Sequence, residues 1–214
     1  MNEGDRHYRR PLDASRDRAL REAALALLVE VGYDRLTLEA VAARAHAGKT
    51  TIYRRWSGKA EMVVDALSSA KGMPAFPDTG SLAGDLYAAA EAIVSPASQF
   101  DARVTIGMIT ALAHDAELRE VFRQRFEQPR TLGFRQLLER AVARGEIARD
   151  RDLDLLAQLF PALMLQHLVL HGEVPDAAFA QRIMAHVVLP LTVAPSDASA
   201  HSSAATSSAV RGSV

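Results

Sequence analysis

Apolar residues recur every three or four positions along most of the chain, a spacing that predicts helices rather than strands. The clearest stripe lies in a helix from about residue 15 or 16 to residue 31 and consists of Leu20, Ala23, Ala24, Leu27, Leu28 and Val31. Gly32 is placed to end this helix as a left-handed cap. Similar stripes predict helices over residues 37–45, 49–55, 57–70, 81–95, 101–114, 131–144, 152–171 and 176–189, with 115–126 continuing its predecessor or starting another. The sequence therefore predicts an all-α fold of about nine helices, ended or broken at Pro96, Pro129 and Pro190.

Polar and helix-breaking segments divide this helical chain into two domains. Residues 1–15 hold a basic cluster and predict a flexible arm that reaches phosphate or a minor groove, although a frayed terminus explains them equally well. Residues 16–71 form the first domain, and Gly and Pro between residues 72 and 80 mark a linker. Residues 80–193 form a second helical domain. Residues 194–214 are rich in Ser and Ala and are expected to be disordered.

Residues 37–59 have the pattern of a helix-turn-helix DNA reader. Thr37 is a good N-cap for a first short helix whose apolar face is Leu38, Val41, Ala42 and Ala45. His46, Ala47 and Gly48 interrupt the pattern, and a second short helix follows with Ile52 and Trp56 pointing inward. This second helix is polar on one side and basic at its end, which suits insertion into a major groove.

These residues resemble the DNA-binding domain of the TetR family of bacterial transcription regulators. The matching features lie between residues 16 and 67 and are Gly32-Tyr33, Thr37, Thr51-Ile52-Tyr53, Trp56 and Lys59. The family usually has Gly where this chain has His46, so we expect His46 in a left-handed conformation. The family often has Ser where this chain has Gly48, which caps a helix less well.

We expect eight residues to contact double-stranded DNA: Thr37, Gly48, Lys49, Thr50, Thr51, Tyr53, Arg54 and Lys59. Lys and Thr are suited to base edges, whereas Tyr53, Arg54, Thr37 and Lys59 are expected on phosphates. For Tyr53 the alternative is packing on the first helix, and Trp56 is assigned to the domain core. One recognition helix reads only a few base pairs, so we expect a two-fold dimer on a palindrome-like operator.

Charge and composition agree with a DNA reader inside a reducing compartment. Residues 1–60 carry 12 Lys or Arg and 8 Asp or Glu, whereas the remainder carries 13 and 18. The chain has no cysteine and its first residues lack an apolar signal segment, so we expect a cytoplasmic protein. Residues 153–170 are strongly apolar but carry Asp154, Gln158, Gln166 and His167, which predicts a buried helix and not a membrane span.

The second domain is expected to dimerise and to bind an effector. The resemblance implies a four-helix bundle across the two-fold axis, built from residues 152–171 and 176–189 of each copy. The candidate interface residues, some of which an internal core would also explain, are Leu155, Leu156, Leu159, Leu163, Ile183, Val187 and Val188. Candidates for a largely apolar ligand pocket, although an ordinary core is the favoured place for any single aromatic or methionine among them, are Phe100, Met108, Leu112, Phe126, Phe134, Phe160, Met164 and His167.

Other chemistries have weaker support in the sequence. His167 and His171 share a helix face, but no cysteine or well-placed carboxylate completes a metal site, so we expect no metal and no cofactor. No nucleophile–base pair or paired carboxylate stands out, so we do not expect an enzyme. The sequence predicts a homodimeric repressor released from its operator by a small ligand. The alternative is a DNA-binding regulator of the same fold that answers to a protein partner or to no ligand.

Overall fold

The structure, a computed structural model, describes residues 4–94 and 102–192 and shows only helices and connecting loops in these two ranges. This confirms the predicted all-α fold. Phe100 and the predicted tail over residues 194–214 lie outside the described residues. The helices are α1 (Gly4–Arg35), α2 (Leu38–Arg44), α3 (Lys49–Tyr53), α4 (Lys59–Lys71), α5 (Leu82–Val94), α6 (Ala102–His114), α7 (Ala116–Phe122), α8 (Gln128–Ala143), α9 (Leu153–His171), α10 (Ala177–Ile183) and α11 (Leu189–Thr192). Two π-helical segments, Arg123–Glu127 and Met184–Val188, join α7 to α8 and α10 to α11.

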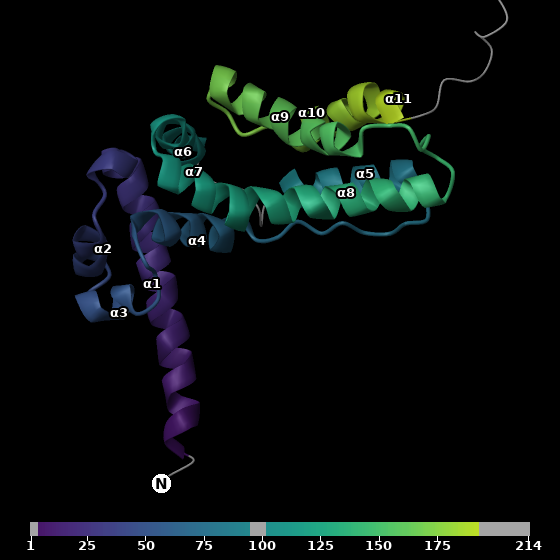
Figure 1. Ribbon diagram of the computed structural model, residues 1–214. Coiled ribbons are helices and arrows are strands. Elements are labelled where there is room, and N and C mark those ends of the chain that lie inside the picture. The colour runs from purple at the N-terminus through teal and green to yellow at the C-terminus, as the bar shows by residue number, and fades with distance from the viewer. Residues whose placement is uncertain (1–3, 95–101, 193–214) are drawn as a thin grey trace, which may run out of the picture.

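The helices form two groups (Figure 1), and each group packs around a hydrophobic core. The first core joins α1–α4 to α6 and α7, and includes Leu28, Ile52 and Leu118. The second core joins α5, α8, α9 and α10, and includes Leu138 and Phe160. The predicted boundary near residues 71–80 therefore does not separate the two cores. Helices α6 and α7 follow this boundary in the sequence but pack in the first core.

One long helix runs through both cores. Leu118 of α7 lies in the first core, and Phe134 of α8 lies in the second. Between them, Arg125 of the π segment forms an ion pair with Glu61 of α4. The boundary between the two cores thus coincides with the π segment and not with a loop.

The sequence predictions that Pro129 breaks a helix and that Pro190 ends one are wrong. In both places a π segment ends two residues before the proline, and the residue four positions before the ring, Arg125 or His186, lies inside that segment. A proline ring clashes with the carbonyl four residues earlier in an α-helix. A π turn holds one extra residue and moves that carbonyl, so the helix continues.

The first helix is longer than its apolar stripe predicts. It begins at Gly4, so the arm predicted to be flexible over residues 1–15 is helical from that residue onward. Helix propagation adds one hydrogen bond per residue once a docked segment has formed the nucleus, which favours this extension. At the other end Gly32 has φ 78° and ψ 166°, a positive φ that glycine adopts readily but not the αL conformation predicted for a left-handed cap, and it kinks the chain before a last turn that ends at Arg35.

The linker after α4 is docked onto α8. A side chain at Gly133 would lie 2.3 Å from the Phe76 ring, so only glycine lets this ring lie against the helix. The start of α5 is held by Asp85, a buried carboxylate that accepts hydrogen bonds from Thr79 and Arg144. Burial opposes the charged form, but these hydrogen bonds outweigh it and lower the pKa of Asp85.

Candidate nucleic-acid interface

The turn between α2 and α3 is closed by backbone hydrogen bonds. His46 has φ 50°, the one positive φ of a non-glycine residue in the described ranges, which confirms its predicted left-handed conformation. The N–H of Ala47 donates to the Ala42 carbonyl at 2.9 Å, and the N–H of His46 donates to the Ala43 carbonyl at 3.2 Å. These two bonds form a Schellman motif, which ends α2 and sets the direction of α3.

Helix α3 packs against the first core on one face and is exposed on the other. Ile52 is fully buried in the first core, and Trp56, just after the helix, is 4% exposed, as predicted for a core residue. The Trp56 indole N–H donates to Asp65 at 2.9 Å, and the same carboxylate oxygen accepts from Arg21 at 2.8 Å. The position of α3 is therefore fixed by apolar packing on one face and by a shared carboxylate at its end.

The predicted contact residues of α3 lie on its accessible side. Gly48 is the N-cap and makes no side-chain hydrogen bond there. Lys49, Thr50 and Arg54 are exposed, Thr51 is half-buried, and Tyr53 is 54% exposed, so packing on α1 does not account for Tyr53. The structure thus brings the candidates on this helix together on one short exposed element.

Thr37 and Lys59, the two candidates outside α3 and its cap, make contacts within the first domain. The Thr37 hydroxyl accepts from the Ala40 N–H at 3.1 Å and so caps α2. The Lys59 ammonium donates to the Tyr33 carbonyl at 3.1 Å and lies 4.1 Å from the centre of the Tyr33 ring. Any phosphate contact by Lys59 competes with these two interactions.

One residue that the sequence analysis did not select contacts α3 directly. Glu39, in the first turn of α2, accepts a hydrogen bond from the Tyr53 hydroxyl at 3.2 Å, and its carboxylate lies 3.6 Å from the Lys49 ammonium. Hydrogen bonds from its own backbone N–H and from Tyr53 lower the pKa of Glu39, so it is an anion at neutral pH. Helical spacing within α2 alone does not reveal these contacts, because they cross the turn.

Two family models match the chain on either side of the linker. The model described as "Bacterial regulatory proteins, tetR family" matches residues 20–66, and the model described as "Tetracyclin repressor-like, C-terminal domain" matches residues 76–187. The chain belongs to the TetR family. The resemblance found in the sequence is confirmed, and it extends through the second domain.

Relatives of this TetR-family chain are similar over most of their length. The DNA-binding transcriptional repressor TetR of Mycobacteroides abscessus is 38% identical over 179 residues, covering 83% of this chain and 94% of that protein. The HTH-type transcriptional regulator YdeS of Bacillus subtilis is 34% identical over 177 residues, covering 82% and 89%. The crystal structure of the TetR family transcription regulator SCO0332 has 27% identity and a TM-score of 0.61, covering 82% and 97%. This chain is a DNA-binding transcriptional regulator.

The residues predicted to bind an effector do not surround one cavity in this TetR-family chain. Met108 is buried in the first core, where Leu112 and Phe126 pack against it. Phe134 and Phe160 are buried in the second core with their rings stacked at 6.4 Å, and Met164 packs against the same core. His167 lies at the edge of this layer, 4.2 Å from the Phe179 ring and 4.5 Å from the His171 ring. The predicted effector residues are thus divided between the two cores, and four of them lie along the interface of α8, α9 and α10.

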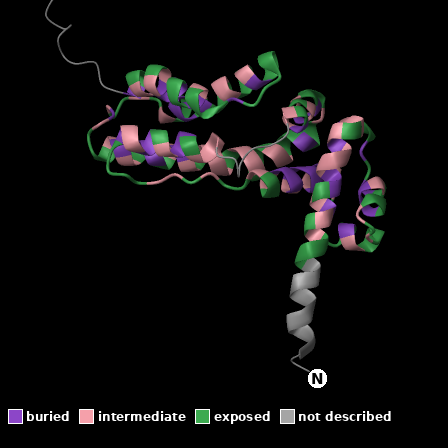
Figure 2. Ribbon diagram, turned by 180° about the vertical axis from the view of Figure 1, so that it is seen from behind, coloured by how far each residue is buried: buried purple, intermediate pink, exposed green. Residues whose placement is uncertain are grey.

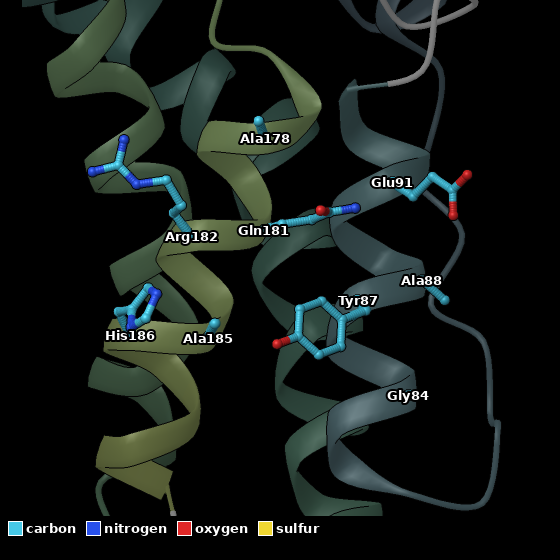
Figure 3. A pocket seen from close by; sticks show the side chains of 9 residues that line it. All are labelled: Gly84, Tyr87, Ala88, Glu91, Ala178, Gln181, Arg182, Ala185 and His186. Carbon is cyan, nitrogen blue, oxygen red and sulfur yellow. The ribbon is translucent and has the colours of Figure 1, made fainter.

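A surface groove of about 770 Å³ lies between α5 and the helix formed by α10 and the following π segment. Its lining includes the small residues Gly84, Ala88, Ala178 and Ala185. Tyr87 and Gln181 point across the groove from opposite helices (Figure 3). None of the seven described residues predicted for the effector lines this groove.

Helix α9 presents an apolar side that no other described part of the chain covers. The exposed side chains Leu155, Leu165, Val169 and Leu170 lie on one side of the helix at 3.6 residues per turn, and exposed positions recur along α9–α11 in Figure 2. By length and composition alone α9 could cross a membrane, and 22% of its most apolar window is buried. The prediction of a buried helix is therefore wrong for a single chain.

The residues predicted for the dimer interface differ in their exposure. Leu156, Ile183 and Val188 are buried in the second core, so they are not available at the surface of one chain. Leu159, Leu163 and Val187 are half-buried against that core, and Leu155 is 59% exposed. The sequence pattern missed Leu165, Val169 and Leu170 because a helix with apolar residues on every side does not indicate its outer face.

Proposed function

We propose that this regulator is a cytoplasmic homodimeric repressor. It places two copies of α3 in successive major grooves of a palindrome-like operator, and a small, largely apolar ligand releases it. Contacts come from Gly48, Lys49, Thr50, Thr51, Tyr53 and Arg54, with Thr37 and Lys59 at the flanking phosphates. The proposal assigns the chain no catalytic activity and no membrane contact.

The outward apolar side of α9 carries the dimer proposal. Four large aliphatic side chains between 40% and 68% exposed on one helix are costly to leave in water. A second copy of the chain is the proposed partner of this surface, because α9, α10 and α11 form the outer layer on one side of the molecule (Figure 1). Two-fold pairing of this surface gives the two reading heads that a palindrome requires.

The test compares two single carboxylate substitutions. Leu165→Glu puts a charge in the proposed interface on α9, and Gln136→Glu puts the same charge on an exposed polar position of α8. Mass photometry and fluorescence anisotropy on DNA from upstream of the protein's own gene are the measurements. We expect the Leu165 variant to be monomeric and to lose specific binding, with the Gln136 variant unchanged. A Leu165 variant that stays dimeric contradicts this interface.

The effector proposal is supported by the layer of Phe134, Phe160, Met164 and His167. Ring and thioether side chains there can rearrange around an apolar molecule. Met164→Trp fills this layer from its half-buried side. In a screen by thermal shift, a ligand that raises the Tm of the wild type and weakens its DNA binding is expected to lose both effects with this variant. Unchanged effects place the ligand elsewhere.

The alternative is a regulator that answers to a protein partner or to no ligand. Its supporting observation is that the second core is filled, with Phe134 at 3% and Phe160 at 1% exposed. A screen without any stabilising ligand, combined with tight operator binding, favours this alternative.

A further inference from the structure

Lys49 and Tyr53, two of the DNA-contact candidates on α3, share one acidic partner. Glu39 lies 3.6 Å from the Lys49 ammonium and accepts a hydrogen bond from the Tyr53 hydroxyl at 3.2 Å. The Glu39 and Lys49 side chains are 47% and 67% exposed, so both can exchange partners without unfolding. Glu39 reaches across the turn from α2, and the Schellman motif fixes the distance between the two helices.

This arrangement has a cost when DNA approaches. Each phosphate that Lys49 neutralises must replace the Glu39 carboxylate as its partner. Glu39 is itself an anion and repels the DNA backbone. Lys49 therefore gains less from a phosphate than an unpaired lysine would, and the penalty applies to every DNA sequence alike.

We propose that Glu39 is a built-in competitor of DNA phosphate that weakens the binding of α3 to DNA of any sequence. A phosphate or a base edge takes Lys49 as its partner only where the gain exceeds the interaction of Lys49 with Glu39. Glu39 therefore lowers the absolute affinity for DNA, and the ratio between specific and non-specific affinity must come from other contacts. The inference rests on the proposed contact of Lys49 and Tyr53 with DNA.

The experiment measures binding to a labelled 30-base-pair duplex of random sequence by anisotropy over a salt series. Glu39→Gln keeps an oxygen that can accept from Tyr53 and removes only the charge. We expect binding about 1.5- to 5-fold tighter at low salt, the range for releasing an exposed ion pair. We also expect a salt slope steeper by about 0.9, the value for one more neutralised phosphate.

Glu30→Gln is the matched control. It makes the same change in net charge in the same domain and breaks a closer ion pair, because Arg44 binds Glu30 through two bonds of 2.6 and 2.7 Å. No residue of α3 takes part in that pair. An equal gain in the Glu30 variant attributes the effect to net charge and overturns the proposal. A Glu39 variant that binds as the wild type, or more weakly, also overturns it.

A Lys49→Met variant separates this inference from the proposed DNA contacts. We expect it to bind the duplex more weakly than the wild type and to reduce the gain from Glu39→Gln to that of the Glu30 control. Wild-type binding by the Lys49 variant refutes the contact itself, and the inference falls with it. Weaker binding by the Lys49 variant without any gain from Glu39→Gln refutes the inference alone. Emission of Trp56, the single tryptophan, verifies that every variant is folded.

Discussion

Asp65 is the residue whose substitution should disturb the position of α3 most directly. Its Oδ2 atom accepts from the Trp56 indole at 2.9 Å and from the Arg21 guanidinium at 2.8 Å. Trp56 follows α3, Arg21 lies on α1, and Asp65 lies on α4, so one carboxylate joins three elements. Asp65→Ala deletes both hydrogen bonds while adding no bulk.

The two lost hydrogen bonds differ in cost. The Trp56 side chain is 4% exposed, so its N–H is left without a partner away from water, which costs about 1–3 kcal/mol. Arg21 is 29% exposed and can return to water, which adds about 0.2–1 kcal/mol. We therefore expect the free energy of unfolding to fall by about 2 kcal/mol, which lowers the Tm by about 4–8 °C for a chain of this size.

Urea unfolding followed by Trp56 fluorescence measures this loss, because the probe is the affected side chain itself. The midpoint should fall without a change in the m-value. Asp65→Asn should lose less, since its amide oxygen can still accept one of the two bonds. Ser69→Ala, at an exposed position of the same helix, is the control. A loss below about 0.5 kcal/mol, the range of surface changes, would refute the reasoning.

Three further predictions follow from local geometry. His46→Val should cost about 1–2 kcal/mol in urea unfolding because a β-branched residue is strained at φ 50°, whereas His46→Gly should be neutral or stabilising; equal stability of both would contradict the Schellman assignment. Gly133→Ala should displace the Phe76 ring, lower stability by about 1–3 kcal/mol and expose the linker to limited proteolysis, and an unchanged digestion pattern would be evidence against docking. The lowered pKa of Asp85 means that its stabilising contribution is complete above about pH 3.9 and is lost as the pH falls through the lower folded pKa. Asp85→Asn should therefore be less stable than the wild type at pH 7, and its stability should fall less between about pH 4 and 2. Parallel curves of stability against pH for the two proteins would disprove the coupling.

Local sequence patterns predict much of this fold because they report local physics. The stripes place the helices, and the departure at His46 predicts a positive φ that the structure has. The inward direction of Trp56 also follows from its spacing after Ile52. Each of these depends on residues only a few positions apart.

What the sequence could not reveal depends on contacts between distant residues or on hydrogen-bond register. Pro129 continues a helix because the preceding turn is π-helical, a choice that no residue type specifies. The aromatic and methionine residues fit a core and a pocket equally well, so their number did not show that they divide between two cores. The contacts of Glu39 with α3 and of Asp65 with Arg21 cross between elements, and no single helical stripe contains them.

The helix that passes through both cores limits how the second domain of this regulator can be exchanged. An exchange between family members at the linker near residue 72 looks natural from the sequence. Such a chimaera would remove Val104, Met108 and Leu118, which belong to the first core although they follow the linker. The first core would then contain side chains from the other family member at these positions. A working exchange must therefore retain these positions of α6 and α7 and place its second junction after Glu127, where the chain passes from one core to the other.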